Sequence, residues 1–106
     1  MALRLSRLAY HRPGRVVPSS ARSLRGRCIV LRQGHVMDWH STHAREELLL
    51  VLSGEVRVEV QSSPRRVRRL RLRAGEGTFF PQETEHRVVN GSRVNASYLY
   101  LTAPVS

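Results

Sequence analysis

Two segments with spaced histidines, glycines and a proline constrain the fold of this 106-residue chain more than any other feature. The first segment carries Gly34, His40, His43, Glu47 and Gly54, and the second carries Gly75, Pro81, His86 and Asn90. Ligands on one helix would recur at i and i+4, whereas several turn signals separate these two segments. The spacing therefore favours side chains that lie on separate strands and meet inside a closed sheet.

The chemistry of these side chains indicates one divalent-metal site. Imidazole nitrogen and carboxylate oxygen are ligands that borderline divalent metals accept, and two histidines with one carboxylate are typical of non-haem iron sites that keep open positions. The glycines and the proline have another role, because glycine permits positive φ in tight turns and proline fixes φ near the start of a strand.

Short alternating segments predict an all-β chain. Residues 55–60 alternate charged and apolar side chains with a period of two, which indicates a strand with one wet and one buried face. Together with the similar segments, the pattern predicts about eight short strands in a double-sheet jelly roll. The other segments are 27–33, 36–40, 48–52, 67–73, 77–80 and 96–102. We further expect hairpins at Ser53-Gly54 and Asn90-Gly91.

The two segments resemble the paired motifs of the cupin superfamily, and the chain is similar to a small single-domain cupin with a conserved barrel. The second motif matches except that Glu83 replaces a glycine, and the first matches except that Thr42 stands where a second histidine is expected. The resemblance covers Gly34 to Asn90. It implies an all-β double-stranded β-helix, the jelly-roll cupin barrel.

The resemblance also implies the metal ligands. Cupin metals usually take three histidines and one glutamate, so His40, Glu47 and His86 are assigned by position. The fourth ligand stays open. Strand alternation points His43 away from His40, but a bulge or loop between Trp39 and Arg45 could turn it inward. The candidate metal set is therefore His40, His43, Glu47 and His86, with a three-residue site or a lost metal as the alternatives.

Glu47 and its neighbour Glu46 are expected to face opposite sides of a strand, and the spacing to Gly54 favours Glu47 as the inward residue. A buried carboxylate requires a metal, a proton or a cationic partner beside it. Five apolar or aromatic residues are candidates for the pocket wall, although alternation allows only some of them inside. These are Met37, Trp39, Phe80, Tyr98 and Tyr100.

Composition separates the chain into an arm and a barrel. Residues 1–25 are rich in arginine, contain no acidic residue, and predict an arm or an added edge strand; residues 26–106 predict one cupin barrel. Cys28 is the only cysteine, which excludes an internal disulfide and favours a core position. The arm superficially resembles a transit peptide, but its apolar part is too short for a secretory signal. We expect a soluble, cytoplasmic protein that does not enter membranes.

The net charge of +10 comes from 18 arginines without a single lysine, which suggests codon bias as part of the explanation. Arginines cluster at 65–73 and could attract an anionic partner. The cluster lacks interleaved aromatic residues for base stacking, so we do not expect a nucleic-acid partner. A charged strand edge that discourages aggregation is the commoner use of such a pattern.

Two function classes follow. In the first, a divalent transition metal (Fe, Mn, Ni or Zn) in the barrel acts on a small organic metabolite, as the resemblance implies for dioxygenases, isomerases and decarboxylases. In the second, the barrel is a metal-free, non-catalytic module that binds a small molecule. Whether the chain is an enzyme stays open at this point. The resemblance to small cupins also implies a homodimer.

Overall fold

The computed structural model describes residues 5–105, so residues 1–4 of the expected arm and residue 106 of the expected barrel lie outside this part. The described residues form nine strands. They are β1 (Gly14–Arg15), β2 (Arg25–Leu31), β3 (Val36–Ser41), β4 (Arg45–Ser53), β5 (Glu55–Ser63), β6 (Arg66–Arg73), β7 (Gly77–Phe80), β8 (Glu85–Val89) and β9 (Ala96–Pro104). No helix within residues 5–105 is long and apolar enough to cross a membrane.

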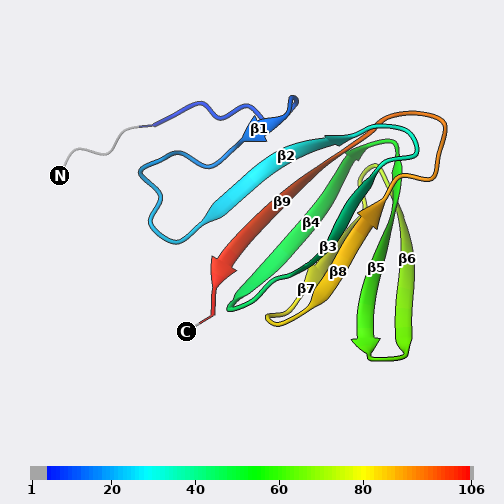
Figure 1. Ribbon diagram of the computed structural model, residues 1–106. Helices are drawn as coiled ribbons and strands as arrows, with labels where there is room; N and C mark the ends of the chain where they lie inside the picture. The colour runs from blue at the N-terminus through cyan, green and yellow to red at the C-terminus, as the bar shows by residue number, and fades with distance from the viewer. Residues whose placement is uncertain (1–4, 106) are drawn as a thin grey trace.

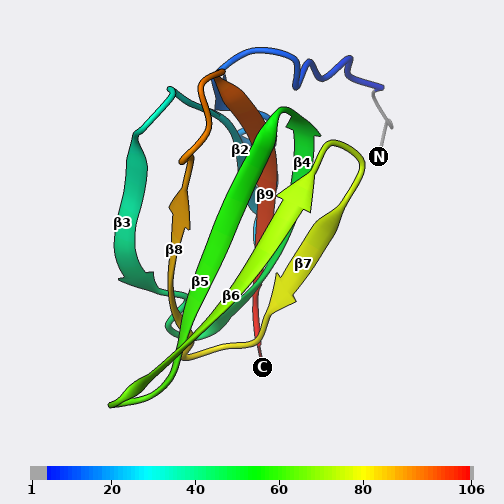
Figure 2. The ribbon, with the colours of Figure 1, turned by 90° about the vertical axis from the view of Figure 1, so that its right-hand side faces the viewer.

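The strands form two antiparallel sheets that face each other (Figure 1). The five-stranded sheet has the order β1-β2-β9-β4-β7, and the four-stranded sheet has the order β3-β8-β5-β6. Figure 2 shows the four-stranded sheet in front of β2, β9 and β4. From β2 onward the chain changes sheet at each connection except the β5–β6 hairpin. This arrangement confirms the predicted jelly roll.

Both predicted hairpins are wrong. Gly54, at φ 74°, connects β4 to β5, and residues 90–95 connect β8 to β9, but in each case the two strands belong to different sheets. The buried side chain of Asn90 shapes the second connection, since its amide donates to the carbonyl oxygens of Leu31 and Val94 at 2.9 Å. A local turn signal shows where the chain reverses, but it does not show whether the next strand pairs or crosses to the other sheet.

The main core lies between the sheets. In β4, Leu49 and Val51 are buried, and they pack with Val56 and Val58 of the opposite sheet, as the period of two requires. A smaller apolar cluster lies on the outer face of the five-stranded sheet. There Val16 and Val17, which follow β1, pack against the buried Cys28. Part of the expected arm therefore covers the edge of its own barrel.

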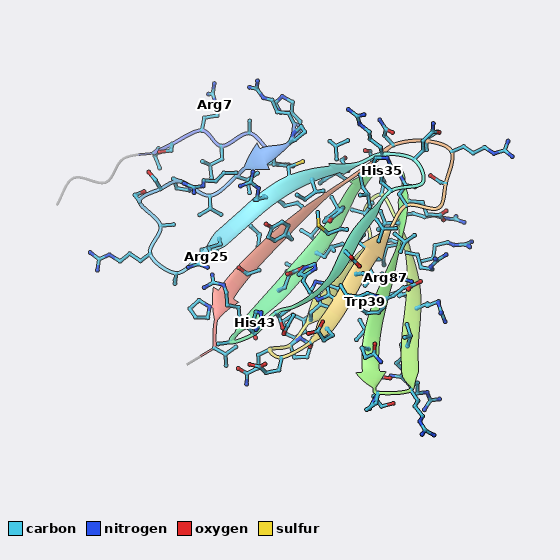
Figure 3. The ribbon with its side chains drawn as sticks, viewed as in Figure 1. Arg7, Arg25, His35, Trp39, His43 and Arg87 are labelled. Carbon is cyan, nitrogen blue, oxygen red and sulfur yellow. The ribbon has the colours of Figure 1, made fainter. Side chains whose placement is uncertain are left out.

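The outer face of the four-stranded sheet carries a buried carboxylate. Glu59 is 1% exposed, and the guanidinium groups of Arg57, Arg69 and Arg87 surround it at 2.7, 3.3 and 2.6 Å. The guanidinium carbon of Arg87 lies 5.0 Å from the ring centre of Trp39, and Figure 3 shows the two residues side by side. Part of the arginine cluster at 65–73 is thus paired within the protein.

Candidate metal site

Three of the four predicted ligands meet at one cavity of the barrel, where Glu47 and His86 are buried and His40 is exposed. One ligand atom each from His40, Glu47 and His86 lies within 4.8 Å of the others. His40 on β3 is directly opposite His86 on β8, and Glu47 reaches them from β4 in the facing sheet. Glu47 is buried whereas Glu46 is exposed, as the sequence predicted. The cluster therefore joins both sheets.

A β-bulge aims His40 at the cluster. The pairing of β3 with β8 shifts register between Met37 and His40, and both of these side chains line the same cavity although they are three residues apart. In a regular strand, residues three apart point to opposite faces. The extra residue of the bulge turns His40 to the same face as Met37, so that both side chains line one cavity.

Both imidazole rings are held by the same kind of backbone contact. Nδ1 of His40 lies 2.8 Å from the carbonyl oxygen of Asp38, and Nδ1 of His86 lies 3.1 Å from that of Thr84. Because a carbonyl oxygen only accepts hydrogen bonds, each Nδ1 carries the proton and donates it. The neutral form of each ring then keeps a lone pair on Nε2, which is the usual arrangement around a histidine ligand.

Within residues 5–105, Nε2 of His86 has no hydrogen-bond partner, although it is fully buried. The nearest opposite charge is the carboxylate of Glu47 at 3.5 Å, which is long for a hydrogen bond. Burial by itself lowers the pKa of His86, but Glu47 and the Thr84 carbonyl outweigh it, so the pKa is raised. A cation between Nε2 and the carboxylate, either a proton or a metal ion, would satisfy both groups. The donor set therefore fits a divalent metal.

The structure places His43 outside this group. His43 is exposed in the turn between β3 and β4 and has φ 51°, and its carbonyl oxygen accepts a hydrogen bond from the amide of Glu83 at 2.7 Å. The bulge that could have turned it inward lies before His40 instead. Glu83 itself has φ 57°, so the position where the motif expects glycine does require the left-handed region.

Thr42, at the position of the missing motif histidine, has a structural role. Its buried hydroxyl donates to the carbonyl oxygen of Pro81 at 2.8 Å and accepts from the amide of Thr84 at 3.0 Å. These bonds tie the turn after β3 to the loop that precedes His86. Thr42 thus orients the site through the backbone and leaves three side chains in the candidate ligand set.

A cavity of about 170 Å³ opens beside the three candidate ligands. Of the predicted wall residues, Met37, Tyr98 and Tyr100 line it. Phe80 instead stacks on the His86 ring, with centroids 4.2 Å apart and planes 17° apart, and Trp39 contacts Arg87. Two further wall residues, Ile29 and Val88, were not predicted. Val88 is two residues after His86, so strand alternation from that predicted ligand would have found it, whereas no predicted inward residue pointed to Ile29.

The cavity is hydrophobic apart from the candidate ligands and two tyrosine hydroxyls. Burial, followed by the negative charge of Glu47, raises the pKa of Tyr98, and burial also raises the pKa of Tyr100. Both phenols are therefore protonated at neutral pH and can donate hydrogen bonds. An oxygen-rich ligand beside the metal ligands would find these donors in place.

A jelly roll with a cavity lined by two histidines and a glutamate defines the class: a small β-barrel protein with a candidate metal centre at that cavity. The chain belongs to the Cupin domain family, whose model matches residues 27–102. Comparison with curated protein sequences gave no match.

Several solved structures share this fold. The Cnp3 cupin domain of Schizosaccharomyces pombe has a TM-score of 0.75 at 12% identity, covering 88% of this chain and 64% of its own. A Cupin 2 conserved barrel domain protein from Salinispora arenicola CNS-205 has a TM-score of 0.73 at 18% identity, covering 99% and 90%. Recombinant oxalate oxidase in complex with glycolate has a TM-score of 0.72 at 19% identity, covering 77% and 42%. The chain thus spans less than two thirds of the Cnp3 domain and of oxalate oxidase, and these likenesses show the fold.

Proposed function

We propose that this protein binds a divalent transition metal through His40, Glu47 and His86, and that the site binds or transforms a small organic metabolite. The observation that carries the proposal is the buried Nε2 of His86, which lies 3.5 Å from Glu47 and has no hydrogen-bond partner among the described residues. Three protein ligands would leave coordination positions free on the metal, which would supply Lewis-acid or redox chemistry there.

The size of the cavity supports a small ligand. At about 170 Å³ it is below the ~300–1,000 Å³ of sites for drug-sized molecules. The structurally similar oxalate oxidase was solved with glycolate, a two-carbon acid. A dioxygenase, an isomerase or a decarboxylase reaction on a small organic acid is therefore the enzymatic form of the proposal. Iron, manganese, nickel and zinc all accept this donor set.

Metal content of protein purified without a polyhistidine tag tests the proposal. We expect near-stoichiometric metal in wild type by inductively coupled plasma mass spectrometry, and its loss in His86→Ala and in the nearly isosteric Glu47→Gln. His43→Ala is the matched control, because it removes an exposed histidine of the same motif and should retain the metal. Circular dichroism of each variant separates loss of the site from loss of the fold.

The alternative is a metal-free module that binds a small molecule without turnover. It is supported by the raised pKa of His86, since a protonated imidazole beside Glu47 satisfies the buried carboxylate without a metal. No metal in wild type after reconstitution with each candidate ion would refute the metal proposal and favour this module. A cytoplasmic location stays a prediction in both cases.

We also propose a homodimer formed through the outer face of the five-stranded sheet. Leu48 and Phe79 are directly opposite on β4 and β7, and they are 41% and 54% exposed. Exposed apolar neighbours of this kind favour burial against a second surface. We expect a dimer in sedimentation velocity, a monomer for Phe79→Glu, and an unchanged dimer for Val94→Glu, whose apolar side chain is exposed in a loop. A monomeric wild type would contradict the proposal.

A further inference from the structure

A second cavity, of about 300 Å³, lies between the N-terminal arm and the start of β2. Tyr100 is a wall of this cavity and also of the cavity beside the candidate metal ligands, so the two cavities adjoin. The charged residues of the second cavity are all arginines. They are Arg15 of β1 and Arg25 and Arg27 of β2.

No acidic side chain among residues 5–105 forms an ion pair with these arginines. Arg15 is directly opposite Arg27 in the β1–β2 pairing, and like charges in that position destabilise a sheet. The sequence has no acidic residue before Asp38, so the arm and β2 supply no local partner. Among the described residues, the ion pairs of arginine with glutamate involve five other arginines and none of these three. The cavity is therefore a concentration of positive charge that an anion would relieve.

Hydrogen bonds hold the arm loop that closes this cavity. The Arg45 guanidinium donates to the carbonyl oxygen of Ser23 and, at 2.9 Å, to the hydroxyl of Thr102. Burial and then the nearby charge of Arg25 lower the pKa of Arg45. Arg45 thus connects the loop to β9 and adds a fourth positive charge near the cavity.

The pairing of the five-stranded sheet directs this charge towards the candidate metal site. Arg25 is opposite Thr102, and Thr102 is in turn opposite Glu47. In the same strand pairing, Arg27 is opposite Tyr100, which is two residues before Thr102. Figure 3 shows Arg25 at the start of β2, next to the arm loop. Alternation places both β2 arginines on the same face as Ile29, which lines the metal cavity.

We propose that the cavity lined by Arg15, Arg25 and Arg27 binds the anionic group, a carboxylate or a phosphate, of a small organic molecule whose other end reaches the candidate metal ligands past Tyr100. Arginine suits this role because its planar guanidinium binds both oxyanions in a bidentate manner. The anion site follows from the arginines alone. That the other end of the ligand extends to the metal rests on the function proposed above.

The anion site is tested on the metal-free, full-length protein. Glycolate and inorganic phosphate are titrated separately at constant ionic strength, with calorimetry for the affinity and backbone amide chemical shifts for the location. For the anion that binds, we expect shifts at Gly26, Arg27 and Tyr100, and an affinity about tenfold weaker in Arg27→Gln. Arg71→Gln, which removes an equally charged exposed side chain on β6, is the matched control and should bind as wild type does.

Equal weakening in Arg27→Gln and Arg71→Gln would overturn the anion site, because it would indicate only a general effect of net charge. Binding of neither anion would overturn it as well. A preference for glycolate supports a carboxylate ligand, and a preference for phosphate supports a phosphorylated one. Either preference is a positive result for the site.

The same titration with Zn²⁺ present tests the reach to the metal. Glycolate binding that Zn²⁺ tightens in wild type but not in Arg27→Gln supports one ligand that contacts both cavities. Equal tightening in the two proteins indicates binding at the metal alone, and that result or an unchanged affinity for both anions contradicts the reach. If the anions bind but Zn²⁺ does not, the proposed metal function fails while the anion site stands. If Zn²⁺ binds but neither anion does, only the inference of an anion site fails.

Discussion

Nε2 of His86 lies 3.5 Å from the carboxylate of Glu47, and in the part of the chain that the structure describes it has no hydrogen-bond partner, although both side chains are buried. Because Nδ1 of His86 already donates to the Thr84 carbonyl, Nε2 is the only ring atom left to bind a cation. A proton and a metal ion would compete for the same position between the two side chains. We therefore expect the stability of the protein, and the metal binding proposed above, to depend on pH.

The first prediction concerns this pH dependence. The folded-state pKa of His86 is raised above its ordinary value of 6.5, so the protonated ring stabilises the metal-free protein fully below about pH 6.5. This stabilisation is lost as the pH rises through the higher folded-state pKa, and the affinity for metal rises over the same interval. Urea unfolding of metal-free wild type should show this loss. Glu47→Gln should reduce it, and identical pH profiles for the two proteins would contradict the assignment.

The second prediction concerns Thr42. Thr42→Val keeps the side-chain shape but removes the bonds to the Pro81 carbonyl and the Thr84 amide, so we expect a loss of about 1–3 kcal/mol in the free energy of unfolding. Metal affinity should fall as well, because the loop that positions His86 is released. Thr42→Ser, which retains the hydroxyl, should stay close to wild type in thermal unfolding and calorimetry. Unchanged stability in Thr42→Val would contradict the prediction, and equal losses in both variants would show that the methyl group contributes as much as the hydroxyl bonds.

The sequence predicted the jelly roll and the inward position of Glu47, because strand alternation and motif spacing are local patterns that the fold preserves. The sequence left the fourth ligand, and so the direction of His43, open for a physical reason. The position of a β-bulge depends on how β3 pairs with β8, and a single strand does not reveal its partner's register. The pairing decides that His40 faces the cavity and that His43 lies in an exposed turn.

The arginines also show that the sequence does not reveal contacts between residues on different strands. The sequence revealed a dense cluster at 65–73, but it did not reveal that Arg69 would share Glu59 with Arg57 and Arg87 from two other strands. It also did not single out Arg15 and Arg27, whose proximity arises only when β1 pairs with β2. The number and spacing of the charges can be read from the sequence, whereas which charges lie together depends on how the strands pair in the sheet.

The third prediction concerns Glu59. Burial raises the pKa of this carboxyl group, but the hydrogen bonds and charges of Arg57 and Arg87 outweigh it and lower the pKa below its ordinary value of 4.5. The ionised group therefore stabilises the fold above about pH 4.5, and this contribution is lost as the pH falls through the lower folded-state pKa. Glu59→Gln should lower the free energy of unfolding by about 1–3 kcal/mol at pH 7. The variant should also lose less stability than wild type as the pH falls. Unchanged stability at pH 7 would show that the arginines are fully solvated.

The fourth prediction uses two glycines with nearly the same backbone conformation, Gly34 at φ 75° and Gly54 at φ 74°. A Cβ at Gly34 would meet nothing within 4 Å, whereas a Cβ at Gly54 would lie 2.8 Å from the carbonyl oxygen of Asn95 and 2.9 Å from Cα of Ala96. Gly34→Ala should therefore lower the free energy of unfolding by only roughly 1–2 kcal/mol, which is the cost of placing a residue with a Cβ in the left-handed region. Gly54→Ala should cost about 1–3 kcal/mol more, because backbone atoms have to move.

Urea unfolding of Gly34→Ala and Gly54→Ala side by side separates backbone conformation from crowding, since the conformational term is common to both variants. The larger loss is expected at Gly54, where the connection from β4 to β5 passes beneath the start of β9. That contact would explain why the position where the chain crosses between the sheets requires glycine, since any other turn residue would carry a Cβ. Equal losses in the two variants would show that the crossing can shift to admit a methyl group, and that positive φ alone fixes glycine at both positions.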